Sequence, residues 1–342
     1  MTAVRTNVVK DPAARTAFVE GVTALKAELV EQDGTVLTTA DLGIPGIDAA
    51  TPPQELSTYD VFVFWHHRTM MIPTPQGSGR NAAHQGPVFL PWHRLMLMLL
   101  ERNIARVLGR PDFGLPYWDW AADGELPVAA QRTAPLWDGT TTGIGGDGDL
   151  GANDDVPDGA FGAGTGFRVH LWSDRFGNLL AVDRPLRRRL GRSTVAPRLP
   201  REEHLTAALA EADYDEPEWD ADPATPGFRN VIEGWPDLPG WRRPNLHNRV
   251  HVWVGGDMSP ATSPNDPVFF LNHCFVDRAW AAWQARPGDR GYRPPDTAPA
   301  ELFRHRPADP LFSVFRRDAA GTPWLVRDMF DVSAVYTYDS LD

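Results

Sequence analysis

The sequence predicts a mainly helical fold with long loops and a few short strands. Apolar residues recur at helical spacing in several segments, and six histidines with metal-ligand spacing lie in or beside those segments. The stretches between them are rich in Gly and Pro, which interrupt regular structure. Of the 342 residues, 42% are hydrophobic and 10% are aromatic, so the chain can bury a substantial core.

The expected helices follow one another along the chain. In residues 12–30, Phe18, Val22 and Leu25 fall on one face, which indicates an amphipathic helix. Capping residues open a second helix over residues 57–71, and Pro91 begins a third that ends near residue 108. Further helical runs are expected at residues 201–212, 246–251 and 269–280.

The chain is expected to form a single domain that spans residues 1–342. Residues 31–56 are expected to be a loop, and residues 139–166, rich in Gly and Asp, are interpreted as a surface excursion within that domain. The Pro-rich segment 286–342 is expected to close the core.

Smaller features complete the prediction. Short strands are expected within residues 168–183 and at residues 335–339. The basic run 184–192 is interpreted as a solvated face, and His204 is placed at the exposed start of its helix. Neither is assigned to a functional site.

Charge and cysteine content exclude several classes of partner. The formal charge of −12 argues against nucleic acid or acidic lipid. The single cysteine, Cys274, cannot form an internal disulfide and is interpreted as a buried structural thiol. Because no apolar leader, twin-Arg motif or membrane-spanning run is found, we expect no membrane partner and a cytoplasmic location, with export by a partner protein left open.

The strongest functional signal is a set of three histidines in the second half of the chain. His247 and His251 stand four residues apart, so on a helix their imidazoles lie on one face and can bind one ion. His273 lies in the next helical run. Three imidazoles from two helices predict a metal site.

A second set lies in the first half: His66, His84 and His93. His93 falls on the apolar stripe of its helix, where a lone histidine is more often a core residue, but its two companions favour a ligand. His66 and His67 are adjacent and point about 100° apart on a helix, so only one can face a shared ion. Spacing alone does not choose between them.

The ligand types narrow the choice of metal. Imidazole suits zinc, copper, iron and nickel. Di-iron bundles use Glu and Glu-x-x-His, and zinc proteases use His-Glu-x-x-His, neither of which is present beside these histidines. A structural zinc protein would use closed sites of four ligands, commonly with Cys. Two all-imidazole sites therefore favour a pair of copper ions that reacts with dioxygen.

The surrounding motifs resemble those of bacterial tyrosinases, which are type-3 copper proteins, over most of the chain. The copper-A pattern is found at residues 59–66 (YDVFVFWH), 80–84 (RNAAH) and 89–94 (FLPWHR). The copper-B pattern is found at residues 246–256 (LHNRVHVWVGG), 265–273 (NDPVFFLNH) and 276–278 (VDR). Motifs of this length are highly specific.

The resemblance implies a four-helix bundle that holds a dinuclear centre of two copper ions, with O₂ as co-substrate. It selects His66 over His67, and it matches Tyr336 and Tyr338 to the tyrosine motif that closes the core domain. The implied metal ligands are His66, His84 and His93 for Cu-A, and His247, His251 and His273 for Cu-B.

The implied activity is oxidation of o-diphenols to o-quinones, with ortho-hydroxylation of monophenols, in melanin or secondary-metabolite formation. In the family, a Glu and the Asn after the first copper-B histidine hold the water that takes the phenol proton. Glu233 and Asn248 occupy these positions. A carboxylate and an amide that share a water can act as a general base. The alternative is a structural role, with Glu233 as an ion-pair partner.

Some residues depart from the family pattern. Asn272 precedes His273 where a second histidine is usual, and Val252 follows His251 where some relatives carry a polar residue. The loop 257–264, in the region that gates access to copper, differs in length. No Cys precedes His84 to form a thioether, and no lid domain is expected to block the site.

These departures leave the substrate open. The main hypothesis is a tyrosinase acting on small phenols, and the resemblance leaves open a copper-delivering caddie protein as partner. The second is an o-aminophenol or catechol oxidase of secondary metabolism with little action on monophenols. The third is an oxygen carrier like haemocyanin, which uses the same six ligands; Glu233 and Asn248 favour an enzyme.

Overall fold

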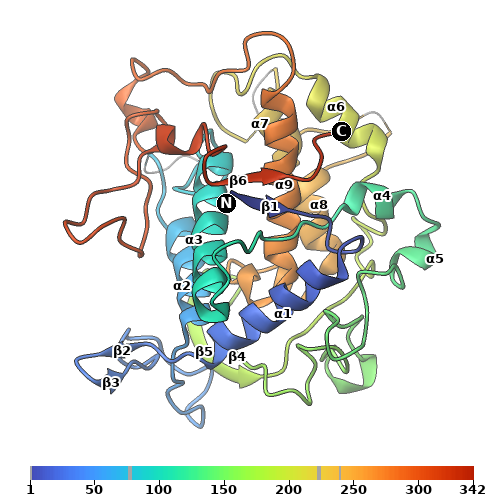
Figure 1. Ribbon diagram of the computed structural model, residues 1–342, viewed down its shortest axis with the longest axis vertical. Helices are drawn as coiled ribbons and strands as arrows, with labels where there is room; N and C mark the ends of the chain where they lie inside the picture. Colours follow the sequence, from blue (N-terminus) through green and yellow to red (C-terminus); the bar gives the residue numbers. More distant parts are fainter. Residues whose placement is uncertain (1, 76–78, 222–224, 239) are drawn as a thin grey trace.

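The computed structural model describes residues 2–75, 79–221, 225–238 and 240–342 (Figure 1). Its α-helices are α1 (Pro12–Ala27), α2 (Thr58–Met70), α3 (Phe89–Leu108), α4 (Trp120–Gly124), α5 (Val128–Gln131), α6 (Glu202–Ala210), α7 (Phe228–Glu233), α8 (Leu246–Val254) and α9 (Val268–Gln284). Its 3₁₀ helices are η1 (Leu150–Ala152), η2 (Gly256–Met258), η3 (Ser263–Asn265), η4 (Ala300–Leu302) and η5 (Val326–Met329). Its strands are β1 (Ala3–Arg5), β2 (Glu31–Gln32), β3 (Thr35–Val36), β4 (Val169–Ser173), β5 (Leu179–Arg184) and β6 (Tyr336–Tyr338).

The mainly helical class is confirmed, and local sequence explains where the helices begin and end. α1 ends at Ala27 because Glu28 adopts an extended backbone. α2 begins with a capping box, in which the Ser57 hydroxyl accepts from the Asp60 N–H and the Asp60 carboxylate accepts from the Ser57 N–H. α3 begins at Phe89, before Pro91, since proline is tolerated in the first helical turn.

The helices that carry histidines lie together in the interior. α3 packs against α1 and α9, and α8 packs against α9 (Figure 1). Trp65 of α2 meets Trp92 of α3 with ring centroids 5.0 Å apart, and both side chains are fully buried. Large aromatic side chains therefore fill the space between the helices that hold the candidate site.

The short strands pair in twos. β4 and β5 form an antiparallel hairpin within the segment predicted to contain strands. Residues 31–56 differ from the expected plain loop, because β2 and β3 pair through a tight turn at Asp33 and Gly34. Both turn residues have positive φ, at 52° and 77°, as a two-residue hairpin turn requires.

A parallel pair, β1 with β6, joins the two ends of the chain over α3 and α9 (Figure 1). The buried Arg5 of β1 donates to Glu101 of α3 at 2.8 Å and to Asp277 of α9 at 3.1 Å. The hydroxyl of Tyr336 donates to Asp277 at 2.5 Å, and Arg94 of α3 donates to the same carboxylate at 2.5 Å. This network ties α3 to α9 close to their histidines, and it satisfies charges that would be costly to bury alone.

Two expectations about exposure are wrong. The basic run 184–192 is not simply a solvated face, since Arg188 is fully buried and pairs with Asp266 through two hydrogen bonds. His204 is 4% exposed, because its ring packs on Trp241 at 4.1 Å. Both side chains gained partners from segments far away in the sequence, which local charge patterns do not reveal.

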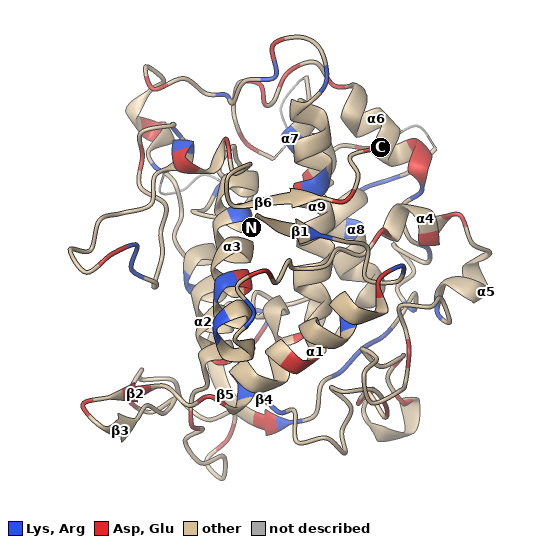
Figure 2. Cartoon of the chain, in the orientation of Figure 1, with Lys and Arg blue, Asp and Glu red and all other residues tan. Residues whose placement is uncertain are grey.

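Positive and negative residues are interspersed along the chain (Figure 2). Many form close pairs, such as the bidentate contact of Arg106 with Glu28. Across the described ranges, no helix has both the length and the apolar character needed to cross a bilayer.

Candidate metal centre

Three histidines from the first half of the chain form one cluster, site A. His66 lies on α2, His93 lies on α3, and His84 lies in the loop between these helices. Each offers one ring nitrogen, and these nitrogens lie within 4.8 Å of one another. All three side chains are buried.

Three histidines from the second half form site B. His247 and His251 lie one turn apart on α8, and His273 faces them from α9. The Nε2 atoms are separated by 2.9 Å for His247 and His251, by 3.1 Å for His247 and His273, and by 3.4 Å for His251 and His273. Three imidazole nitrogens that converge in this way fit a shared metal ion.

Backbone carbonyls orient the rings. The Nδ1 atom of His66 lies 2.7 Å from the carbonyl oxygen of Ala261, and that of His251 lies 2.7 Å from the carbonyl oxygen of Met258. His93 makes the same contact with its own helix, at 2.8 Å from Phe89. Because a carbonyl oxygen only accepts, Nδ1 carries the proton and Nε2 keeps a lone pair for a metal.

The two sites face each other across α3 and α9. The rings of His93 and His273 stack, with centroids 4.2 Å apart and planes 13° apart. Phe269 contacts rings of both sites, at 5.0 Å from His66 and 4.1 Å from His273. The rigid aromatic contacts hold the two clusters as one unit.

Burial keeps the six imidazoles neutral. It lowers the pKa of His66 to about 3 and that of His251 to about 4. Burial also lowers the pKa of the other four histidines of the two sites well below the ordinary value, and neighbouring histidines add to this effect. Neutral rings at physiological pH offer lone pairs, as metal binding requires.

His67 points away from both sites. Its Nε2 lies 3.0 Å from the carbonyl oxygen of Gly177 in the β4–β5 hairpin. The structure therefore groups His66, and not His67, with His84 and His93.

The loop that carries His84 is held by contacts that sequence reasoning missed. The Asn81 side chain accepts from the His84 N–H at 2.8 Å. The buried ring of His305 accepts from the Val88 N–H at 3.4 Å and donates to the Thr74 hydroxyl at 2.6 Å. Asn81 could have been noticed as a turn residue close before a ligand. His305 lies more than two hundred residues from this loop, and nothing in the sequence around it indicates a contact with the loop.

Glu233 and Asn248 both lie beside site B. The Nδ1 of His247 lies 3.1 Å from Oδ1 of Asn248 and 3.3 Å from the carbonyl oxygen of Glu233. The buried carboxylate of Glu233 accepts from the Gln85 N–H at 2.8 Å and from Arg229 at 3.0 Å. Burial raises the pKa of Glu233, and Arg229 opposes this rise.

The donor atoms fit copper. Within the part of the chain that the structure describes, Nε2 of His66 and Nε2 of His93 are buried and have no hydrogen-bond partner. Polar atoms are rarely buried in this state unless they bind something. Neutral imidazoles suit copper among the transition metals, and a site without carboxylates disfavours magnesium or calcium.

Comparisons with known proteins agree with this geometry. The common central domain of tyrosinase matches residues 56–286. A tyrosinase of Streptomyces glaucescens is 38% identical over 265 residues, which is 72% of this chain and 86% of that protein. Grixazone synthase of Streptomyces griseus is 35% identical over 301 residues, which is 82% of this chain and 90% of that protein.

Solved structures share the fold. A polyphenol oxidase of Thermothelomyces thermophila aligns with a TM-score of 0.66 at 21% identity, covering 99% of this chain and 89% of that one. A functional unit of octopus haemocyanin aligns with a TM-score of 0.53 at 20% identity, covering 99% and 69%. With its two facing histidine clusters and a match over most of its length, the chain belongs to the tyrosinase family of dicopper proteins.

Proposed function

We propose that this protein is a type-3 copper oxidase that uses O₂ to oxidise o-diphenols to o-quinones and to hydroxylate monophenols at the ortho position. The observation that carries this proposal is the pair of facing, buried clusters of neutral imidazoles. His66, His84 and His93 would hold one copper ion, and His247, His251 and His273 would hold the other. The bound copper pair supplies the electron exchange with O₂.

Glu233 and Asn248 are proposed to hold the water that takes the proton of a monophenol. Both residues contact His247 and so lie on the side of the centre formed by site B. Arg229 and the Gln85 N–H fix the carboxylate of Glu233, which leaves it lone pairs for a water. The ion pair with Arg229 is also the contact expected if Glu233 has only a structural role. An activity measurement is therefore needed to distinguish the structural role from the water-holding role.

We further propose that the whole chain acts as one domain. Each half supplies one histidine cluster, and the ring stack of His93 on His273 crosses between the halves. The pairing of β6, in the last segment, with β1, near the start of the chain, supports this proposal.

The oxidation of an o-aminophenol is the second candidate. The similarity to a grixazone synthase favours it, and Val252, half-buried beside His251, offers no charge to a substrate. It requires the same copper pair but not a water held by Glu233 and Asn248.

The test is oxygen uptake by the copper-loaded protein with L-tyrosine, L-DOPA and 3-amino-4-hydroxybenzoate in parallel. Oxidation of tyrosine after a lag supports the tyrosinase proposal, and turnover of only the other two supports the second candidate. Glu233→Gln should lower tyrosine oxidation about 100-fold and leave L-DOPA oxidation nearly unchanged. Reversible O₂ binding without turnover of any substrate would contradict an enzyme.

A copper-delivering caddie protein is also proposed as a partner. Five of the six histidines are 8% exposed or less, so copper has to pass through the packed interior to reach them. Isolated metal-free chain should therefore take up copper slowly. Metal analysis at successive times after addition of copper measures this uptake. Rapid and complete uptake by the chain alone would contradict the need for such a partner.

A further inference from the structure

One loop orients a ligand of each metal site. We call residues 257–262 the bridging loop. Its Met258 carbonyl accepts from Nδ1 of His251 in site B at 2.7 Å, and its Ala261 carbonyl accepts from Nδ1 of His66 in site A at 2.7 Å. A shift of this loop would therefore turn one imidazole in each site.

The far end of the bridging loop is attached to α2 and β4. The Tyr59 hydroxyl of α2 donates to the Pro264 carbonyl at 2.7 Å, just beyond the loop. The Ser173 N–H of β4 donates to the hydroxyl of Thr262 at 3.2 Å. This end is held by neutral hydrogen bonds among buried residues.

The near end is attached to the basic run 184–192. The Asp257 N–H donates to the Arg187 carbonyl at 2.9 Å, and the Arg189 N–H donates to the Val254 carbonyl at 2.8 Å. Gly256 has φ of +53°, and a Cβ atom there would lie 2.2 Å from the Arg187 carbonyl oxygen. The backbone of the run is thus in direct contact with the start of the loop.

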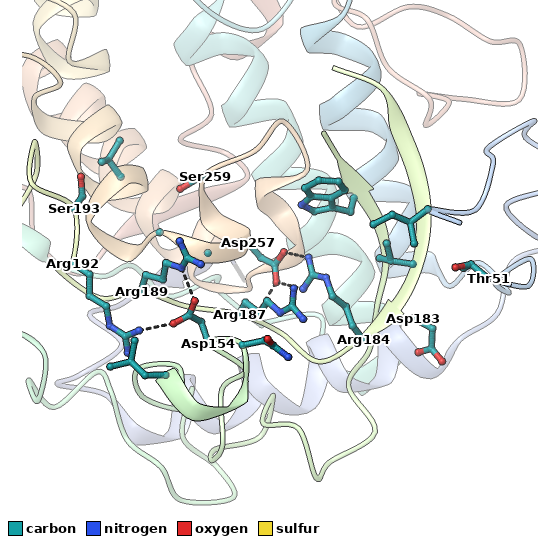
Figure 3. A pocket seen from close by; sticks show the side chains of 18 of the residues that line it. Thr51, Asp154, Asp183, Arg184, Arg187, Arg189, Arg192, Ser193, Asp257 and Ser259 are labelled. Atoms are coloured by element: carbon teal, nitrogen blue, oxygen red, sulfur yellow. Dashed lines mark hydrogen bonds and ion pairs between the residues drawn. The ribbon is translucent and has the colours of Figure 1, made fainter. Parts of the chain in front are cut away.

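Asp257 fixes this attachment through its side chain. Its carboxylate accepts two hydrogen bonds from the guanidinium of Arg184, at 2.5 and 2.8 Å, and one from the Arg187 N–H at 2.8 Å. The Asp257 side chain is 2% exposed and that of Arg184 is 15% exposed. Figure 3 shows this pair in a surface groove that is also lined by Arg187, Arg189 and Arg192 of the run. A bidentate pair this far from solvent has a defined geometry.

We propose that Asp257, clamped by Arg184, is a positioning residue that holds the bridging loop so that both copper sites keep a correctly turned ligand. This inference rests on the proposed function, because it assumes that the two clusters bind copper. It assigns a role to a charged pair that touches neither histidine and lies outside both ligand sets.

The experiment compares copper release from Asp257→Asn, Arg184→Gln and the double variant with that of the unaltered chain. Each protein is loaded with Cu(I) and mixed, without O₂, with excess of the Cu(I) chelator bicinchoninate at a temperature at which it is folded. Each single variant should release copper about 10-fold faster from both sites. The double variant should release it no faster than the single variants, because they remove the same contact.

Arg168→Gln is the matched control. Arg168 pairs with Asp183 at 2.7 Å beside the same hairpin, and the side chains are largely exposed, at 34% and 51%. Among the residues that the structure describes, this pair makes no hydrogen bond or ion pair with the bridging loop. Its copper release should equal that of the unaltered chain. If Arg168→Gln accelerated release as much as Asp257→Asn, a general loss of charge would explain the effect and the proposal would be overturned.

A second measurement does not depend on copper. Amide hydrogen exchange in residues 255–262 of the metal-free chain should be faster in Asp257→Asn than in Arg168→Gln. Unchanged exchange together with unchanged copper release would overturn the positioning role. Failure of the proposed function would instead be visible in the unaltered chain, which would then not retain two copper ions.

Discussion

The two metal sites are built from different scaffolds. In site B all three histidines lie on helices, and helical spacing alone stacks His247 over His251. In site A one ligand, His84, lies in a loop between α2 and α3. The backbone of a helix is held by its own hydrogen bonds, which sets the direction of its side chains, whereas a loop depends on contacts from elsewhere.

Those outside contacts are visible around His84. The Asn81 side chain accepts from the His84 N–H. Gln85, the residue after His84, has φ of +61° and donates its N–H to Glu233 of α7. Glu233 in turn accepts from His247 through its backbone carbonyl. The loop of site A is therefore linked through Glu233 of α7 to His247 on α8 of site B. The less regular scaffold of site A is thus stabilised by contacts with the helical scaffold of site B.

Removal of a ligand should have the largest effect and should test whether the sites act as one centre. His84→Ala and His251→Ala should each retain one copper ion instead of two and lose O₂-dependent diphenol oxidation to the background level. Metal analysis and oxygen uptake measure both quantities. Retained oxidation in either variant would show that a single copper is sufficient, contrary to a dinuclear centre.

The histidines that lie on helices could be predicted from the sequence, but the contacts that orient their rings could not. The spacing of His247 and His251 and the apolar stripe through His93 are local signals, and the helical class follows from the same periodicity. The choice of His66 over His67 came only from the family register. The contact of His66 with Ala261 joins residues 195 positions apart through a backbone atom, which no side-chain pattern records.

Acid should affect the two sites alike, because burial is the main cause of the low pKa in both. The pKa is about 3 for His66 of site A and about 4 for His251 of site B, against the model-peptide value of 6.5. The unfolded chain therefore binds more protons below pH 6.5, so the unfolding free energy of metal-free protein falls as the pH drops from about 6.5 toward about 4.

Urea unfolding of the metal-free chain at about pH 7.5 and about pH 5 measures this effect, which should amount to several kcal/mol, since each unit of pKa shift corresponds to about 1.4 kcal/mol. His66→Phe and His251→Phe should each reduce the pH dependence. Equal stability at the two pH values would contradict the neutral, buried state of the imidazoles.

We call His305 the brace of the site A loop, because its ring contacts Thr74 and Val88 on either side of His84. Loss of this brace should weaken copper binding in site A and leave site B unchanged. His305→Phe keeps a ring in the fully buried position but removes the hydrogen bonds with Thr74 and Val88. We expect a loss of about 1–3 kcal/mol in unfolding free energy and faster copper release from one site only. Chelator kinetics with two phases, one unchanged, would show this.

The matched control for the brace is His204→Phe. His204 is also buried, accepts from the Arg201 N–H at 3.0 Å and packs on Trp241, but it belongs to neither site. It should lose a similar amount of stability and keep copper in both sites. Equal acceleration of both release phases in His305→Phe would mean that the brace is not specific to site A.

The smallest effect is expected at the outer ends of the site A helices. Arg106, in the last turn of α3, donates to both oxygens of Glu28 at 2.7 Å, and the Thr58 hydroxyl at the start of α2 donates to the same carboxylate. The pair lowers the pKa of Glu28 to about 2, chiefly through the hydrogen bonds from Arg106. The side chains are 52% and 35% exposed, so solvent and salt screen the interaction.

Arg106→Gln should therefore lower the unfolding free energy by less than about 1 kcal/mol and leave copper release from both sites unchanged. The small contribution should be present above the ordinary pKa of a glutamate and lost as the pH falls toward about 2, because the folded-state pKa of Glu28 is depressed. Urea unfolding at low and high salt, beside chelator kinetics, tests both expectations. Faster release from site A alone would mean that the outer helix ends, and not only the loop contacts, hold its scaffold; unchanged release would leave His84 and its loop as the point at which the two sites differ.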